Sequence, residues 1–243
     1  MGKVIMSGIV PLLTKPSTGI LASSLAVGSV VKLMEGGTAV DYLVVNQGIP
    51  ENSSLYDSSC NGTWLLRKDV HSKRQWNSSD TGSYNNCSVN TWLNSDFFNA
   101  LGRVEQAVIK QVKIPYYDYE SSGVVESGAN GLSCKIFLLG GCEIGFTTDD
   151  APLVPVDGAK LSYFESGTSS SAMNKRIAYL NGSVTSWWLR SLNTDEYTVW
   201  NVSSRGDILS GSSKSSLDGV RPVLILPSTA KFDETTMILK GAA

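Results

Sequence analysis

Two apolar segments that contain an arginine bracket a polar segment near the C-terminal end of the chain. The first segment is TSWWLRSL (185–192) and the second is DGVRPVLIL (218–226). Bulky side chains at successive positions are typical of strands that are covered on both faces. The two segments therefore predict core strands, which fix both ends of the polar segment between them.

We expect four residues of these segments to act as structural anchors: Trp187, Trp188, Arg190 and Arg221. An arginine beside such a strand is usually buried and paired, because its guanidinium can donate to several carbonyl groups or to a carboxylate. The nearest acids in the sequence, Asp195 and Asp218, are the expected partners. The alternative is that the two arginines bind an anionic ligand.

The segment between the anchors consists mainly of Ser, Asn, Asp, Thr, Gly and Tyr. Short polar side chains adapt their hydrogen bonds, and Tyr and Trp provide contact area at low entropic cost. Such loops on a rigid scaffold often carry recognition. The predicted ligand-binding residues are Asn193, Asp195, Tyr197, Trp200, Asn201, Ser203, Ser210 and Ser212. The alternative is a solvated loop with no binding role.

The composition excludes several classes of protein. The chain has 243 residues, of which 42% are hydrophobic and 17% charged, with a net charge of −2. We expect no nucleic-acid binding, because no run of Lys and Arg could neutralise a row of phosphates. We expect no membrane insertion, because no apolar stretch reaches the roughly 18 residues that a span needs.

We also expect no cofactor and no metal ion. The four cysteines are irregularly spaced and His71 is the only histidine, which disfavours zinc. Calcium needs several converging oxygen atoms. Asp149–Asp150 and Asp157–Gly158 are the candidates for such a site, but they do not form a dense acidic run.

Residues 1–24 are predicted to form an extended N-terminal arm for docking or oligomerisation. They are apolar, broken by Ser7, Gly8 and Pro11, and without a clear period, which also disfavours a signal peptide. Exposed apolar residues of an arm need cover from a partner. The expected docking residues are Ile5, Ile9, Val10, Leu12 and Leu13.

Residues 25–243 are predicted to form one domain. Glycines between two apolar runs indicate a hairpin over 29–34 and 39–46, and 63–70 is a third expected strand. Apolar residues at three- and four-residue spacing predict two helices, over 88–101 and 103–112. In the first helix, we interpret Trp92, Asn94 and Phe97 as core and capping residues. Later strands are expected at 186–190, 197–202 and 222–226, with a last hairpin around KFDETTMIL.

Four ordered motifs resemble a family of uncharacterised domains found in gut Firmicutes and their prophages. The motifs are VNTWLNSDFFNAL, IFLLGGCEIGF, WWLRS and DGVRPVLIL, and the resemblance covers about residues 25–230. The chain departs from the family pattern at Leu192, where Pro is usual, and at Gly140, where Ser is usual. The family is similar to the C-type-lectin-like fold of formylglycine-generating enzymes and of variable proteins from diversity-generating retroelements.

The resemblance implies an α+β, C-type-lectin-like single domain with two early helices, a twisted antiparallel sheet and long loops. It also implies a non-enzymatic phage or prophage virion protein, made in the bacterial cytoplasm. The cysteine pair of the enzyme branch is not carried over, because no cysteine follows Cys142.

We expect the protein to be a surface-recognition module of a tail fibre or baseplate that binds a bacterial glycan or protein. The alternative is a structural role in the virion, such as capsid decoration. Its other expected partners are virion subunits, through the arm, and further copies of itself.

Overall fold

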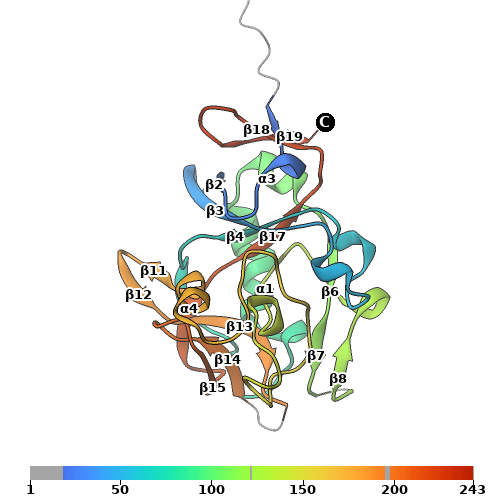
Figure 1. Ribbon diagram of the computed structural model, residues 1–243, viewed down its shortest axis with the longest axis vertical. Coiled ribbons are helices and arrows are strands. Elements are labelled where there is room, and N and C mark those ends of the chain that lie inside the picture. The colour runs from blue at the N-terminus through green and yellow to red at the C-terminus, as the bar shows by residue number, and fades with distance from the viewer. Residues whose placement is uncertain (1–18, 121, 195–197, 243) are drawn as a thin grey trace, which may run out of the picture.

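The computed structural model describes residues 19–120, 122–194 and 198–242 (Figure 1). Strands make up 36% of the structure and helices 20%, so the fold is mainly β. The predicted α+β, C-type-lectin-like class is therefore wrong. The expected helices exist but are short, and strands arranged in several sheets make up a larger share of the structure than helices do.

The first five-stranded sheet joins strands from both halves of the chain in the order β10-β17-β4-β3-β2. Its neighbouring strands are all antiparallel. The strands are β2 (Val30–Glu35), β3 (Thr38–Gln47), β4 (Thr63–Arg67), β10 (Ile136–Phe137) and β17 (Val223–Leu226). The predicted first hairpin is confirmed, and its turn residues Gly36 and Gly37 both have positive φ, which suits a tight hairpin turn.

The second five-stranded sheet has the order β15-β14-β13-β16-β5. The β13–β16 pair is parallel and the other pairs are antiparallel. The strands are β5 (Ser72–Gln75), β13 (Trp187–Leu192), β14 (Thr198–Val202), β15 (Ile208–Ser213) and β16 (Leu217–Val220). In Figure 1, β13, β14 and β15 lie in the lower half, whereas β2, β3, β4 and β17 lie in the upper half.

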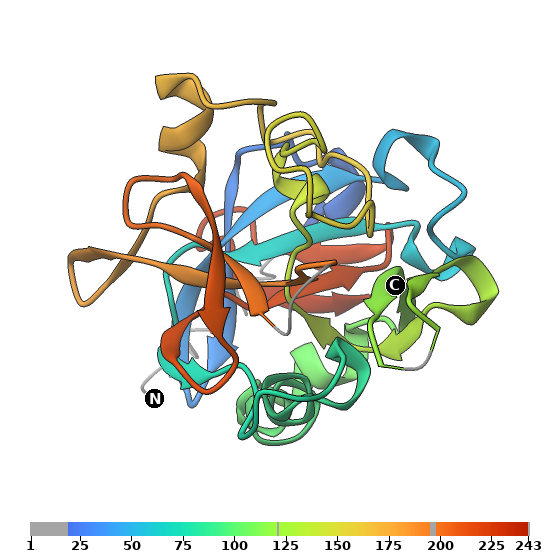
Figure 2. The same ribbon diagram turned by 90° about the horizontal axis from the view of Figure 1, so that it is seen from below.

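Four smaller sheets surround these two. One has three strands: β1 (Ile20–Leu21), β18 (Ala230–Phe232) and β19 (Leu239–Ala242). Three are two-stranded: β6 (Val112–Ile114) with β9 (Leu132–Cys134), β7 (Tyr116–Asp118) with β8 (Val124–Glu126), and β11 (Ala178–Leu180) with β12 (Ser183–Thr185). The β11–β12 hairpin projects from the body in both Figure 1 and Figure 2.

The helical segments are short. The α-helices are α1 (Ser88–Trp92), α2 (Phe98–Ala100), α3 (Arg103–Val108) and α4 (Ser170–Arg176), and η5 (Leu93–Phe97) is a π-helix between α1 and α2. The 3-10 turns are η1 (Ala22–Ser24), η2 (Pro50–Asn52), η3 (Ser58–Cys60), η4 (Tyr84–Asn86), η6 (Gly128–Asn130) and η7 (Cys142–Ile144). Among the described residues, no helix is both long and apolar enough to cross a membrane.

Helical elements from η4 to α3 lie together at one side of the sheets, in green at the lower edge of Figure 2. Asn94 fixes this segment to the first sheet. Its Nδ2 donates to the Ile136 carbonyl at 2.8 Å, and its Oδ1 accepts from the Lys135 and Ile136 N–H groups at 2.9 and 3.1 Å. Asn94 therefore positions the helical segment against β10.

The N-terminal end of the described chain belongs to the folded body. Ile20 and Leu21 pair with β18, and Ala22 is fully buried. The boundary predicted at residue 24 therefore lies inside the domain. The docking residues Ile5, Ile9, Val10, Leu12 and Leu13 lie outside the described residues.

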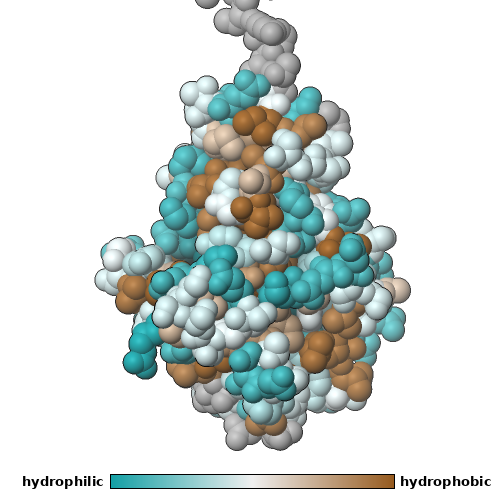
Figure 3. Space-filling model, viewed as in Figure 1, coloured by the Kyte–Doolittle hydropathy of each residue, from teal (hydrophilic) through white to brown (hydrophobic). Residues whose placement is uncertain are grey.

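The surface is mixed in character. On the face shown in Figure 3, hydrophobic residues form several separate patches among hydrophilic ones. Scattered apolar residues are normal on a soluble protein. The most exposed large apolar side chains include Leu217 at 66%, Val124 at 54% and Val156 at 53%.

Candidate functional site

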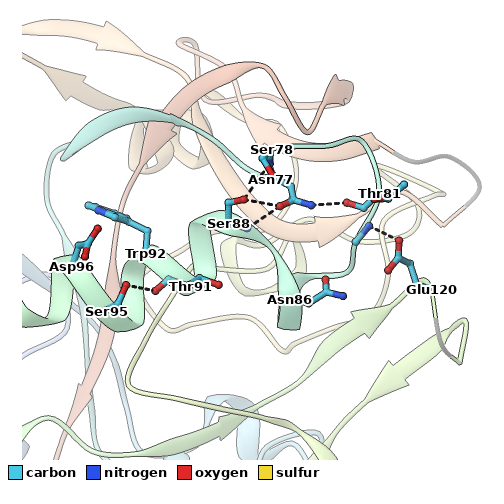
Figure 4. A pocket seen from close by; sticks show the side chains of 11 residues that line it. Asn77, Ser78, Thr81, Asn86, Ser88, Thr91, Trp92, Ser95, Asp96 and Glu120 are labelled. Atoms are coloured by element: carbon cyan, nitrogen blue, oxygen red, sulfur yellow. Dashed lines mark hydrogen bonds between the residues drawn. The ribbon is translucent and has the colours of Figure 1, made fainter.

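A polar groove of about 570 Å³ runs between the start of the helical segment and the loop that precedes it. The loop contributes Asn77, Ser78 and Thr81. The helical segment contributes Asn86, Ser88, Thr91 and Ser95, together with the indole of Trp92. In Figure 4, Trp92 and Asp96 lie near one end of the groove and Glu120 near the other. We call this the Trp92 groove.

Asn77 holds the two walls of the groove together. It is buried, and its Oδ1 accepts hydrogen bonds from the backbone N–H and the hydroxyl of Ser88, at 2.9 and 2.8 Å. Its Nδ2 donates to the Thr81 carbonyl at 2.7 Å. The first N–H groups of a helix have no partner within the helix, so Asn77 satisfies one of them from outside.

The far end of the loop is fixed at Gly82. Its φ is +95°, and a Cβ there would lie 2.9 Å from Nδ2 of Asn77, so glycine suits the position. The Gly82 N–H donates to the Glu120 carboxylate, and the Gly82 carbonyl accepts from Nζ of Lys214 at 2.7 Å. Contacts from both sides therefore give the groove a defined shape.

Trp92 is half-buried at the point where the helix changes its geometry. The π-helix begins at the next residue, and such turns are frequent at functional sites. The Arg74 guanidinium lies over the indole, 3.8 Å from its centroid, and the rings of His71 and Phe97 lie 5.3 and 5.4 Å away. These neighbours fix the indole in place while part of it faces the groove.

The structure buries four of the predicted ligand-binding residues. The exposed fractions are 2% for Asn193, 6% for Trp200, 6% for Asn201 and 8% for Ser203. The prediction that these four form an exposed surface is therefore wrong. Asp195 and Tyr197 lie outside the described residues, as do the side chains of Ser210 and Ser212.

The physical reason is that β14, which carries Trp200 and Asn201, is an interior strand of the second sheet, and that Asn201 and Ser203 find hydrogen-bond partners inside the protein. Nδ2 of Asn201 donates to Asp218 at 2.5 Å, and Ser203 Oγ accepts from the N–H groups of Arg205 and Asp207 at 3.1 and 3.3 Å. A polar side chain that is hydrogen-bonded internally can be buried without a large cost.

Arg190 lies in a fully buried charge cluster with Glu143 and Asp157. Its Nη1 and Nη2 donate to the two Glu143 oxygens at 2.6 and 2.8 Å. Its guanidinium also donates to the carbonyls of Pro115, Leu138 and Asp157. Of the two expected partners, Asp218 is not among these contacts and Asp195 lies outside the described residues.

The cluster joins β13 to the loops that follow β10. The Ser191 hydroxyl lies 2.9 Å from both Asp157 oxygens, and the Tyr56 hydroxyl donates to Glu143 at 2.7 Å. Burial raises the pKa of Asp157 to about 6. A Cβ at Gly140 would lie 2.6 Å from an Asp157 oxygen, so no larger residue fits there without a shift.

Arg221 lies where the chain passes from the second sheet to the first. Its Nε and Nη2 donate to the carbonyls of Arg67 and Lys68 at 3.2 and 2.8 Å, and its guanidinium carbon is 4.7 Å from the centroid of the Trp187 ring. The expected acid, Asp218, instead accepts from Ser186 and Asn201. Since Arg190 and Arg221 are each 1% exposed, neither can reach a ligand at the surface.

Trp187 and Trp188 are both fully buried. The Trp187 indole donates to the Arg176 carbonyl at 2.9 Å, and the Trp188 indole donates to the Arg74 carbonyl at 2.8 Å. Trp188 thereby ties β13 to β5, the strand that carries Arg74 beside the groove.

The sequence interpretation missed the Trp92 groove. The apolar spacing of the helix predicts that Trp92 belongs to the core, whereas the structure leaves it partly exposed. One signal was available. Ser88, Thr91 and Ser95 recur at three- and four-residue spacing, which places polar side chains along one helix face.

The chain belongs to the family described as a domain of unknown function (DUF6273), whose model matches residues 61–228. The match includes every residue named above as lining the Trp92 groove and the whole Arg190 cluster except Tyr56. No curated protein and no solved structure matches the chain.

Proposed function

We propose that the protein is a non-enzymatic recognition module that binds a hydroxyl-rich bacterial surface glycan in the Trp92 groove. The observation that carries the proposal is a fixed, half-buried indole beside a row of amide and hydroxyl side chains. Binding pockets commonly combine an aromatic surface with a few placed polar groups. A sugar offers C–H groups to the indole and hydroxyl groups to Asn, Ser and Thr side chains.

A binding role also agrees with the raised pKa values of the four cysteine thiols. Burial raises the pKa of the Cys60, Cys87 and Cys142 thiols to about 12, and it also raises that of Cys134. These thiols stay protonated at neutral pH, whereas a thiol nucleophile must be ionised. Burial lowers the pKa of His71, whose ring packs against Trp92 and Phe97.

The setting that we propose is a phage or prophage virion, with the domain on a tail fibre or baseplate. The support is the resemblance of the four ordered motifs to prophage-encoded domains. In this proposal the N-terminal arm docks on other virion subunits, and several copies act together. Multivalent display strengthens binding when each site is weak.

The test is binding of the purified chain to an array of bacterial surface glycans, followed by titration of the glycans that bind. Trp92→Ala should weaken binding about tenfold or more, because it removes the aromatic surface, whereas Trp92→Phe should keep most of the affinity. Thermal unfolding should show that both variants are folded.

Tyr179→Ala is the matched control, since Tyr179 is an exposed aromatic residue, at 45%, on the projecting β11–β12 hairpin. It should bind like the unchanged protein. If Tyr179→Ala loses binding while Trp92→Ala keeps it, recognition belongs to the hairpin and the groove proposal is wrong.

A second candidate is a structural role, as a decoration or cement protein of the virion. Two observations favour it: the burial of Trp200 and its neighbours, and the exposed cross-strand pair of Tyr179 and Val184 on the β11–β12 hairpin. Particles that lack the protein decide between the two. Normal adsorption with reduced particle stability supports the structural role, and lost adsorption supports recognition.

A further inference from the structure

A second hollow, of about 300 Å³, adjoins the Trp92 groove on the side of β5. Ser78, Ser88 and Trp92 line both spaces, so the two form one continuous surface. The second hollow adds Lys73 and Arg74 from β5. Its charge therefore differs from that of the Trp92 groove, which contains the carboxylates of Asp96 and Glu120.

Arg74 is held in a fixed position in this hollow. Its carbonyl accepts the indole N–H of Trp188 at 2.8 Å, and its strand pairs with β16. Its guanidinium stacks on the Trp92 ring, 3.8 Å from the centroid. A stacked guanidinium keeps its N–H donors at its edge, where they can meet a planar or tetrahedral anion.

Arg74 also carries a donor that the protein does not satisfy. Within the described part of the chain, its Nε is buried and has no hydrogen-bond partner. Buried donors on charged groups are normally paired, so an orphan donor calls for a physical explanation. Since this Nε is buried, it cannot itself reach an anion in the hollow, but it shows that the protein does not saturate the donors of Arg74.

Lys73 provides a second positive charge in the same hollow. It is exposed, and across residues 19–120, 122–194 and 198–242 neither Lys73 nor Arg74 lies within ion-pair distance of a carboxylate. Two neighbouring cations without an acidic partner attract anions from solution.

We infer that the Lys73–Arg74 hollow binds an anionic group, a phosphate or a carboxylate, on the same glycan whose hydroxyl groups occupy the Trp92 groove. This inference rests on the proposed function and specifies its ligand. Arginine forms paired hydrogen bonds with both kinds of anion, and lysine adds a point charge. The ligand class is therefore an acidic, hydroxyl-rich glycan.

The experiment uses an array that carries neutral, phosphorylated and uronate-containing bacterial glycans. The full chain should prefer the acidic glycans, and Lys73→Gln and Arg74→Gln should each weaken that binding about tenfold. Lys73→Gln should change binding to neutral glycans less than twofold. Arg74→Gln also removes the guanidinium that fixes the Trp92 indole, so only its effect on acidic glycans is compared. Inorganic phosphate should compete with the acidic glycans, and added salt should weaken their binding.

Two controls make the result specific. Lys231→Gln removes a cation from β18 in the separate three-stranded sheet and should leave all binding unchanged. Because Arg74 is partly buried, Arg74→Gln could alter the fold, whereas Lys73 is exposed and its variant tests the charge alone. Preference for phosphorylated over uronate glycans, or the reverse, identifies the anion.

The outcomes separate the two proposals. The inference is overturned if the unchanged protein, Lys73→Gln and Arg74→Gln all bind acidic glycans no better than neutral ones. The glycan-binding function would still stand in that case. No binding to any glycan overturns both. Loss of neutral and acidic binding alike in Lys73→Gln also overturns the inference, since an anion subsite would affect only acidic ligands.

Discussion

Asn77 and Ser88 form a two-point contact, in which one amide oxygen accepts both the backbone N–H and the hydroxyl of Ser88. This contact closes the loop before the helical segment onto the first turn of α1. Asn77 is thus one of the side chains that give the groove its shape, and a change at that position should affect stability and binding together.

Asn77→Ala should lower the free energy of unfolding by about 1–3 kcal/mol, because it leaves buried polar groups without partners. It should also weaken glycan binding, because the loop is no longer held to the helix. Chemical denaturation and titration measure the two effects. Asn86→Ala is the control, since Asn86 is exposed and lines the same groove. It should lower affinity while leaving stability within about 0.5 kcal/mol.

Unlike Trp92, Trp200 is expected to contribute to stability and not to glycan binding. It is 6% exposed, and within the described residues its buried indole N–H has no partner. Trp200→Ala should cost about 3–5 kcal/mol of stability, because it leaves a large cavity. Trp200→Phe should cost much less, because it also removes an unsatisfied donor.

The measurements for Trp200 are urea denaturation of both variants and glycan binding by Trp200→Phe. Binding should be unchanged. A Trp200→Phe variant that is as stable as the unchanged protein and yet loses binding would restore the original prediction that this residue contacts ligand.

Local patterns predicted several elements correctly, because the signals that form them are local. The Gly36–Gly37 turn and its flanking apolar runs specify the β2–β3 hairpin, and apolar spacing indicates the helical segment from residue 88. The assembly of sheets could not be predicted in this way. β5 pairs with β16, and β10 with β17, across long stretches of sequence.

The sequence does not distinguish the segment around Trp200 from the Trp92 groove, for a related reason. Composition describes which side chains a segment has, but not whether the fold gives them partners. The Asn and Ser residues around Trp200 resemble a binding loop, yet Asp218 accepts a hydrogen bond from the Asn201 side chain inside the sheet. Trp92 fits a helical apolar face, yet the π-helix that begins at Leu93 alters the spacing that an α-helix would give.

Arg190 should be essential for stability. Arg190→Met leaves the buried Glu143 and Asp157 carboxyl groups without a cation, and breaking a buried pair in this way costs about 3–5 kcal/mol. Adding Glu143→Gln should restore part of the loss, because the amide oxygen can still accept from the Gly140 N–H while the amide NH2 can donate to the Tyr56 hydroxyl. The single substitution Arg190→Lys should also lower the stability. One ammonium group cannot reach the carbonyls of Pro115, Leu138 and Asp157 together with Glu143.

Denaturation of the three Arg190 variants gives the comparison. Equal stability of Arg190→Met and the unchanged protein would show that the cluster contributes little to the fold.

The same cluster predicts an unusual dependence of stability on pH. Burial raises the pKa of Asp157 to about 6, whereas an Asp in an unfolded chain has a pKa near 3.8. Between these values the folded state holds more protons than the unfolded state. The contribution of Asp157 to the free energy of unfolding therefore falls as the pH rises from about 4 to about 6, by about 2–3 kcal/mol at most.

Other carboxyl groups change the pH dependence of stability in the opposite direction. Hydrogen bonds from Lys32 and Lys240 lower the pKa values of Asp41 and Asp233, so these groups lose their stabilising effect as the pH falls. The contribution of Asp157 therefore has to be measured as a difference, by denaturation of Asp157→Asn and the unchanged protein between pH 4 and pH 7.

The Asp157→Asn variant cannot ionise at this position, so its stability relative to the unchanged protein should rise across that range. Asp149→Asn, which removes a carboxyl group at an exposed position, is the control variant for the substitution itself. A constant difference between Asp157→Asn and the unchanged protein would mean that Asp157 keeps one protonation state throughout, and that its proton does not couple to folding. A relative rise would instead identify Asp157 as the group through which the buried cluster around Arg190 responds to pH.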